Sequence, residues 1–236
     1  MGAVTSHSKV GRRDLPDLVT FEPGSDYVNS LSDRAYYLLR ERIVTLDIAP
    51  GATIDERALQ NELELGRTPI REALHRLARE KLIVVAPYRG MFASSIDLAD
   101  LRAVNEVRVE LEGHAAFLAS GRVEDKDAGE IENLISALNA RRECAAAREL
   151  MQLDHQTHAL IHRAARNAYL LSTLREYYIH SLRMWFLVLD RMRHIEDAVS
   201  EHVELLIAIH DGQARLARRL MRAHVADFEK RLRAVM

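Results

Sequence analysis

The clearest periodic pattern in the chain lies in residues 66–77, where apolar side chains recur along one face of a helix. The positions at i, i+3, i+4 and i+7 are Ile70, Ala73, Leu74 and Leu77. This spacing predicts an amphipathic helix with a single buried stripe. Basic or hydrogen-bonding residues lie elsewhere on the helix, namely Arg67, Thr68, Arg71 and His75. Such a helix fits the major groove of DNA, and the alternative is a solvated surface helix.

Two shorter apolar patterns precede this helix and predict two more. The first helix is expected to begin near Ser32, a suitable N-cap, and to run to about Leu46. Its inner face consists of Ala35, Leu38, Leu39 and Ile43. The second is expected to start at Asp55 and to turn Leu59, Leu63 and Leu65 inward. Gly66 then turns the chain into the third helix, and this order predicts a helix-turn-helix.

The pattern changes after Lys81 from helical spacing to strand-forming residues. Leu82-Ile83-Val84-Val85 and Met91-Phe92-Ala93 flank a turn at residues 87–90, which predicts a β-hairpin. Arg89 lies at the tip of this hairpin, where it can reach a phosphate or the minor groove. An ordinary surface hairpin is the alternative. The order of three helices followed by a hairpin favours a winged helix-turn-helix.

From about Leu98 onward, almost every segment is helix-forming. We predict six helices, over roughly 98–119, 125–141, 144–166, 168–191, 195–210 and 213–234. They are expected to form an antiparallel helical bundle. The sequence therefore predicts a mainly α protein. Its parts are a flexible N-terminal arm over 1–28, a winged helix-turn-helix domain over 29–95 and a helical domain over 96–236.

Composition narrows the classes of function. The formal net charge of the 236 residues is −2, so any affinity for nucleic acid must come from a local patch. Residues 66–81 provide one, with five lysines and arginines against two glutamates. Cys144 is the only cysteine, which excludes an internal disulfide and a cysteine-based zinc site. No apolar run approaches the ~20 residues of a membrane span, and we expect a cytoplasmic protein without a membrane partner.

Four residues of the helical half carry metal-ligating groups that can point inward together. Asp154 and His158 are four residues apart on one face of the third bundle helix, while His202 and His224 lie in the fifth and sixth. One carboxylate oxygen and three imidazole nitrogens suit zinc, nickel, manganese or iron. The alternative is a surface Asp–His pair and two unrelated, partly exposed histidines.

Arg108 lies in the first bundle helix, four residues before Glu112. One interpretation is a surface ion pair between these two residues. The other is a guanidinium directed into the bundle, where it would bind a ligand carboxylate through two hydrogen bonds.

These residues resemble a known family. The N-terminal part is similar to the winged-helix domain of GntR-type bacterial transcription regulators, and the helical part to the FadR C-terminal (FCD) ligand-binding domain. The first resemblance rests on Ala49-Pro50-Gly51, Asp55-Glu56-Arg57, Gly66-Arg67-Thr68-Pro69-Ile70-Arg71-Glu72-Ala73-Leu74 and Arg76-Leu77. The second rests on Arg108-Val-Glu-Leu-Glu112, Asp154-x-x-x-His158, Ala164-Ala165-Arg166-Asn167, Glu201-His202 and His224. Six bundle helices resemble the shorter, VanR-like version of that domain.

The resemblance implies a homodimer that binds a pseudo-palindromic operator in double-stranded DNA and senses a small metabolite. It implies DNA contacts at Arg57, Arg67, Thr68, Arg71, Arg89 and Gly90. It implies metal ligands at Asp154, His158, His202 and His224, and an effector carboxylate contact at Arg108. Gly66 departs from the family, which usually has Ser or Thr there to cap the helix and contact a phosphate.

The expected function is a metabolite-responsive transcription regulator. It would act as a repressor released from its operator by a small organic acid bound at a divalent metal ion, with zinc as the expected ion and nickel, manganese or iron as alternatives. One competing hypothesis is a metalloenzyme with a DNA-binding appendage. The four ligands leave no evident general base and no metalloprotease motif is present, so we expect no enzymatic activity. Another is a regulator whose metal is purely structural.

Overall fold

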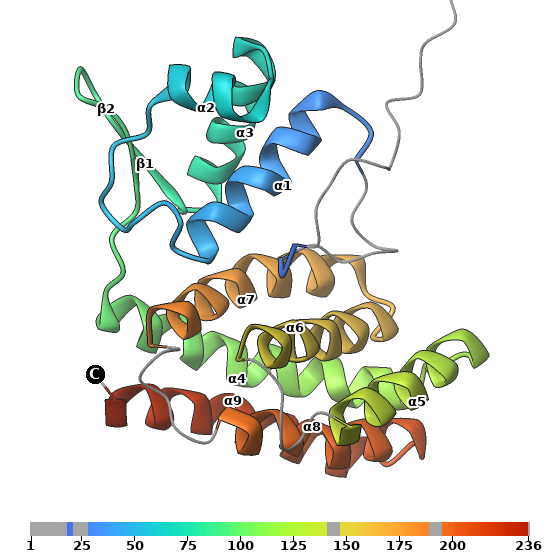
Figure 1. Ribbon diagram of the computed structural model, residues 1–236. Helices are drawn as coiled ribbons and strands as arrows, with labels where there is room; N and C mark the ends of the chain where they lie inside the picture. Colours follow the sequence, from blue (N-terminus) through green and yellow to red (C-terminus); the bar gives the residue numbers. More distant parts are fainter. Residues whose placement is uncertain (1–17, 21–27, 141–146, 189–194, 236) are drawn as a thin grey trace, which may run out of the picture. The chain divides into compact units, whose positions relative to one another are not determined.

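The computed structural model describes residues 18–20, 28–140, 147–188 and 195–235. The described residues divide into two compact units, the first lying within 1–42 and 51–94 and the second within 43–50 and 95–236. The described elements confirm the predicted fold class, three helices with a β-hairpin followed by a helical bundle (Figure 1).

The first unit is built around the buried stripe of its third helix. Its elements are α1 (Leu31–Val44), α2 (Glu56–Leu63), α3 (Arg67–Arg79), β1 (Ile83–Ala86) and β2 (Gly90–Ala93). The stripe predicted for α3 is confirmed, since Ile70, Ala73, Leu74 and Leu77 are all buried. The hairpin pairs antiparallel, with Ile83 opposite Ala93. Backbone hydrogen bonds from Gly51 and Ile54 to β2 hold the hairpin to the segment that precedes α2.

The start of α1 differs from the prediction. Ser30, and not Ser32, is the N-cap, because Ser30 Oγ accepts the backbone N–H of Asp33 at 3.0 Å. The Asp33 carboxylate in turn accepts the N–H of Asn29 at 3.1 Å, so the two side chains satisfy helix-end donors reciprocally. Ser32 lies inside the first turn, where its hydroxyl donates to Glu72 of α3. The predicted cap was wrong because both serines precede the same apolar pattern.

Residues 18–20, which lie within the predicted arm over 1–28, form hydrogen bonds with α1. The backbone N–H groups of Val19 and Thr20 donate to the Glu41 carboxylate at 3.0 and 2.9 Å. Arg40 donates to the carbonyl oxygen of Thr20. These bonds hold the segment to the C-terminal half of α1. Residues 1–17 and 21–27 lie outside the described residues.

The second unit confirms the six predicted bundle helices among the described residues. They are α4 (Leu98–Ser120), α5 (Asp125–Ala140), α6 (Ala147–Ala164), α7 (Ala168–Val188), α8 (Ile195–His210) and α9 (Ala214–Val235). Within this unit α4 runs through the middle, with α6 and α7 on one side and α8 and α9 on the other (Figure 1). Gly113 permits the close approach of α4 to α9, because a Cβ there would lie 2.5 Å from Arg222 Cγ. No helix in the described part of the chain is long and apolar enough to span a membrane.

Candidate nucleic-acid surface and metal-ligating cluster

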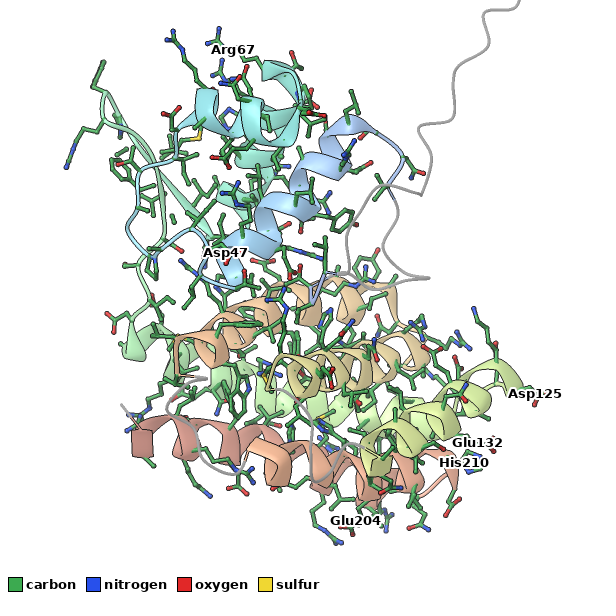
Figure 2. The ribbon with its side chains drawn as sticks, in the orientation of Figure 1. Asp47, Arg67, Asp125, Glu132, Glu204 and His210 are labelled. Carbon is green, nitrogen blue, oxygen red and sulfur yellow. The ribbon has the colours of Figure 1, made fainter. Side chains whose placement is uncertain are left out.

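The outward face of α3 is polar and basic. Arg67, Thr68 and Arg71 are all exposed, as is His75 one turn after Arg71. Figure 2 shows Arg67 on the outer surface of its unit. The ion pair between Arg71 and Glu56 is weak, since Arg71 Nε lies 3.9 Å from Glu56 Oε2. The guanidinium groups of Arg67 and Arg71 are therefore accessible to a ligand.

Gly66 is the N-cap of α3 and provides no side-chain hydrogen bond to the helix. Its backbone is extended, with φ −67° and ψ 167°, the conformation that capping residues of any type adopt. The nearest atom to a Cβ built at Gly66 is Pro69 Cδ, at an ordinary contact distance of 3.8 Å. A serine therefore fits at this position without moving its neighbours.

The remaining predicted DNA contacts also lie on the surface of the first unit. Arg57 on α2 is exposed, and Arg89 and Gly90 are exposed at the turn between β1 and β2. The turn uses two positive φ angles, 61° at Tyr88 and 98° at Gly90, and the second favours glycine. Gly90 thus shapes the hairpin tip on which Arg89 is presented.

In the second unit the structure brings the four predicted metal ligands together from α6, α8 and α9. One ligand atom from each of Asp154, His158, His202 and His224 lies within 4.8 Å of all the others. The first three residues are buried and His224 is nearly so. The surface alternative considered from the sequence is therefore wrong for this set, because the side chains converge in the bundle interior.

The distances within this cluster fit a metal ion. His158 Nε2 lies 3.3 Å from His224 Nε2. Asp154 Oδ1 lies 3.5 Å from His202 Nε2 and 3.9 Å from His224 Nε2. A tetrahedral zinc ion with bonds of about 2.1 Å requires ligand atoms about 3.4 Å apart. One carboxylate and three imidazoles also have the donor chemistry of a zinc or related divalent site, so the cluster can bind a metal ion.

Glu112 of α4 lies beside this cluster and accepts hydrogen bonds from three side chains. Arg108 donates to Oε1 through Nε at 3.2 Å and through Nη2 at 2.7 Å. The other oxygen, Oε2, lies 3.0 Å from His158 Nδ1 and 2.7 Å from His162 Nε2. Glu112 is fully buried, so these four contacts replace the water that it loses on folding.

The protonation states follow from this environment. Burial by itself raises the pKa of Glu112, but His162, His158 and Arg108 outweigh it and hold that pKa well below its usual value. Glu112 is therefore an ionised carboxylate, which can only accept hydrogen bonds. Burial lowers the pKa of His158, although Glu112 and Asp154 act in the opposite direction. A neutral imidazole keeps one nitrogen without a proton, as a metal ligand requires.

Two further residues contact the ligands and were missed in the sequence. The Tyr178 hydroxyl of α7 donates to Asp154 Oδ2 at 2.5 Å, which leaves Oδ1 directed toward His202 and His224. Burial and then Asp154 raise the pKa of Tyr178 well above its usual value, so the hydroxyl keeps its proton. Glu201 Oε2 lies 3.2 Å from His224 Nδ1.

Some of these missed residues left a weak signal in the sequence. His162 follows His158 by four positions, and that spacing places both rings on one helix face. Glu201 directly precedes His202 but serves His224, 23 residues further along the chain. Tyr178 carries no such pattern, because its partner Asp154 lies on another helix.

Arg108 combines features of both interpretations made from the sequence. It pairs with Glu112, as the first proposed, but it is buried and directed into the bundle, as the second proposed. Its guanidinium also lies 5.0 Å from the centre of the Tyr178 ring. A guanidinium has five N–H donors, so Arg108 has donors left for a second carboxylate while it holds Glu112.

A groove of about 640 Å³ lies elsewhere in the second unit, between α4 and α9. Its lining includes Arg102, Glu106, Glu229 and Arg233, and none of the cluster residues. The buried cluster and this charged surface groove are therefore separate features.

Comparison with known proteins agrees with both halves of the molecule. Residues 31–92 match the family described as bacterial regulatory proteins, gntR family, and residues 103–227 match the FCD domain. An HTH-type transcriptional regulator from an unstable DNA locus of Streptomyces ambofaciens is 30% identical over 203 residues, which cover 84% of this chain and 85% of the relative. The HTH-type transcriptional repressor RspR of Escherichia coli (strain K12) is 22% identical, over 92% of this chain and 95% of the relative.

Solved structures show the same fold. The E. coli protein McbR/YncC matches with a TM-score of 0.79 at 19% identity, over 88% of this chain and 99% of its own. A GntR regulator from Rhodococcus sp. RHA1 matches with a TM-score of 0.69 at 18% identity, over 87% and 98%. The resemblance drawn from the sequence is thus confirmed across both units. The chain belongs to the gntR family of bacterial regulatory proteins and carries, after its winged helix-turn-helix, an FCD domain.

Proposed function

We propose that the protein is a homodimeric, metal-dependent repressor that leaves its operator when a small carboxylic acid binds in the FCD domain. The observation that carries this proposal is the convergence of one carboxylate and three imidazoles inside the bundle of a DNA-binding regulator. Two relatives, RspR and GlaR of E. coli, are repressors, and this supports repression over activation.

The DNA-binding role rests on the exposed face of α3 and the hairpin tip. Arg67 and Arg71 are the residues that we expect to read base edges, with guanine as the expected base, through paired hydrogen bonds. Thr68, Arg57, Arg89 and the Gly90 backbone position the domain on the phosphates and the minor groove. In a homodimer two such surfaces fit the half-sites of a pseudo-palindrome.

The effector-binding role rests on the buried cluster. Asp154, His158, His202 and His224 are the proposed ligands of a divalent ion, with zinc expected from the donor set. In octahedral coordination, four protein ligands would leave the ion two open positions for a carboxylate. Arg108 provides a second positive group for the same acid, shared with Glu112. Release from DNA requires that the acid binds more tightly to the arrangement that does not fit the operator.

The proposal is tested by selecting binding sites from a random double-stranded DNA pool with the zinc-loaded protein. We expect a pseudo-palindromic sequence to be enriched. Fluorescence anisotropy on that sequence then allows a panel of sugar acids, hydroxy acids, dicarboxylates and aromatic acids to be screened, and an effector is expected to weaken binding by about 5- to 150-fold. Failure to enrich any sequence would refute the operator. Unchanged affinity with every acid would favour a purely structural ion.

The hairpin tip gives a first prediction. Arg89→Ala is expected to weaken operator binding less than substitutions on α3, because a phosphate contact contributes mainly through counterion release. The slope of log affinity against log salt concentration is expected to fall in magnitude by about 1. An unchanged slope in anisotropy titrations over several salt concentrations would remove Arg89 from the interface.

The start of α3 gives a second prediction. Gly66→Ser adds a hydroxyl where the Cβ has room, and that hydroxyl can cap α3 and donate to a phosphate. We expect operator affinity to rise by a free energy of about 1 kcal/mol, the typical net value of one added hydrogen bond. Gly66→Ala is the matched control, since it adds the Cβ without the hydroxyl. Equal affinities of the two variants would contradict the phosphate contact.

A further inference from the structure

Each of three ligand side chains in the buried cluster has its second polar atom held by a neighbour. Glu112 lies 3.0 Å from His158 Nδ1, and Glu201 lies 3.2 Å from His224 Nδ1. Tyr178 donates to Asp154 Oδ2. In all three cases the atom that faces the other ligands is the remaining one, Nε2 of each histidine and Oδ1 of the aspartate.

The two carboxylates determine where the protons of these histidines lie. A carboxylate only accepts hydrogen bonds, so the Nδ1 atoms of His158 and His224 are the ones that carry hydrogen. In neutral rings with this tautomer the Nε2 atoms bear the lone pairs, and the two Nε2 atoms lie 3.3 Å apart inside the bundle. Two facing lone pairs repel each other unless a cation lies between them. The hydrogen bonds to the carboxylates therefore prepare both rings for coordination.

We propose that Glu112 and Glu201 are positioning residues, which fix the ring orientation and the Nδ1–H tautomer of His158 and His224 so that both Nε2 atoms converge on one ion. This inference rests on the metal centre of the proposed function and assigns roles to two residues outside its ligand set. Carboxylates that hold metal-ligating histidines in this way typically strengthen metal binding 10- to 100-fold.

A competing interpretation treats Glu112, His158 and His162 as a second metal site, because their ligand atoms also lie close together. Two observations favour the positioning role. The Arg108 guanidinium lies on the same carboxylate, with Nη2 at 2.7 Å from Oε1, and would repel a cation held by Glu112. His158 would also have to coordinate through both nitrogens, which a neutral imidazole with one proton cannot do. The structure thus favours one ion per chain.

Glu201 is the better target for mutation. Its side chain is 38% exposed, and its other oxygen accepts a hydrogen bond from Arg231 of α9. Replacement of Glu201 therefore leaves no deeply buried charge without a partner. Removal of Glu112 would leave Arg108 buried and uncompensated, so a Glu112 variant can fail to fold.

The test measures zinc affinity by competition with a chromogenic chelator, using the full chain. Glu201→Gln is expected to bind zinc about 10- to 100-fold more weakly than the natural protein. Glu204→Gln is the matched control. Glu204 lies on the same helix, and its exposed side chain points away from the bundle (Figure 2). Substitution by Co²⁺ adds a spectroscopic readout, since its visible absorption reports the ligand geometry. We expect an altered spectrum for Glu201→Gln and an unchanged one for Glu204→Gln.

His162→Ala tests the role assigned to the Glu112 group. We expect one zinc ion per chain both before and after this substitution, by elemental analysis. A stoichiometry that falls from two to one in His162→Ala would overturn the positioning role of Glu112 in favour of a second ion. Equal zinc affinity of Glu201→Gln and Glu204→Gln would overturn the role of Glu201.

The outcome for the natural protein separates failure of this inference from failure of the proposed function. If the natural protein binds no zinc, the metal centre itself is refuted. If it binds zinc and the glutamate variants behave alike, only the positioning role fails.

Discussion

If the proposed metal centre binds zinc, removal of that ion is expected to lower the free energy of unfolding by about 4 kcal/mol, measured against a sample with free zinc about 1,000-fold above the Kd. The reason is that the ligand atoms of Asp154, His158, His202 and His224 converge only in the folded bundle. An ion that binds the folded state and not the unfolded chain stabilises the former by mass action. Chemical denaturation with and without a chelator measures the difference.

The gain in the free energy of unfolding on adding zinc is expected to disappear in His202→Ala. His202 is fully buried in α8, and its Nε2 lies 3.5 Å from Asp154 Oδ1. Since the substitution also leaves a cavity, the quantity to compare is the gain on adding zinc within each variant, not the absolute stability. His210→Ala is the matched control, because His210 is an exposed histidine of the same helix (Figure 2). Equal gains in the two variants would refute the ligand role of His202.

The double variant Arg67→Ala/Arg71→Ala is expected to lose about 2–6 kcal/mol of specific operator binding, because each arginine that reads a base contributes about 1–3 kcal/mol. Both side chains are exposed and lie one turn apart on α3, outside its buried stripe. Anisotropy titrations on the selected operator and on a scrambled duplex separate specific from non-specific binding. The loss is expected on the operator and not on the scrambled sequence.

Arg79→Ala provides the control for this prediction. Arg79 is an exposed arginine of the same helix, but it lies in the last turn, outside the set predicted to contact DNA. A base-reading role predicts that single Arg71→Ala weakens operator binding more than Arg79→Ala. If the two single variants lose the same affinity on both duplexes, α3 contributes only a general positive charge.

Much of the fold could be predicted because its signals are local. The helical spacing from Ile70 to Leu77 identified the buried face of α3, and the alternation of turn and β-branched residues identified the hairpin. A local pattern does not decide between two candidate N-cap residues that lie close together, as Ser30 and Ser32 show. Residues 18–20 are held by Glu41 and Arg40, more than 19 residues away, so no local pattern could place them.

The candidate metal ligands were accessible from the sequence for a different reason. Asp154 and His158 share a helix face, and the resemblance to a known domain linked them to His202 and His224. The residues that support them were not accessible, because their partners are distant in sequence. Glu112 contacts His158 46 residues later, and the Tyr178 hydroxyl reaches Asp154 from another helix. Such contacts depend on how the helices pack against each other. The spacing of residues along one helix does not show this packing.

The origin of the ligands from α6, α8 and α9 has a consequence for how the bundle moves. Amide hydrogens inside helices exchange with solvent when those helices open locally. An ion shared by these three helices opposes their separation, while α5 and α7 contribute no ligand. Zinc is therefore expected to slow hydrogen exchange selectively in α6, α8 and α9. Binding of the ion is therefore expected to be measurable as reduced local opening of these three helices.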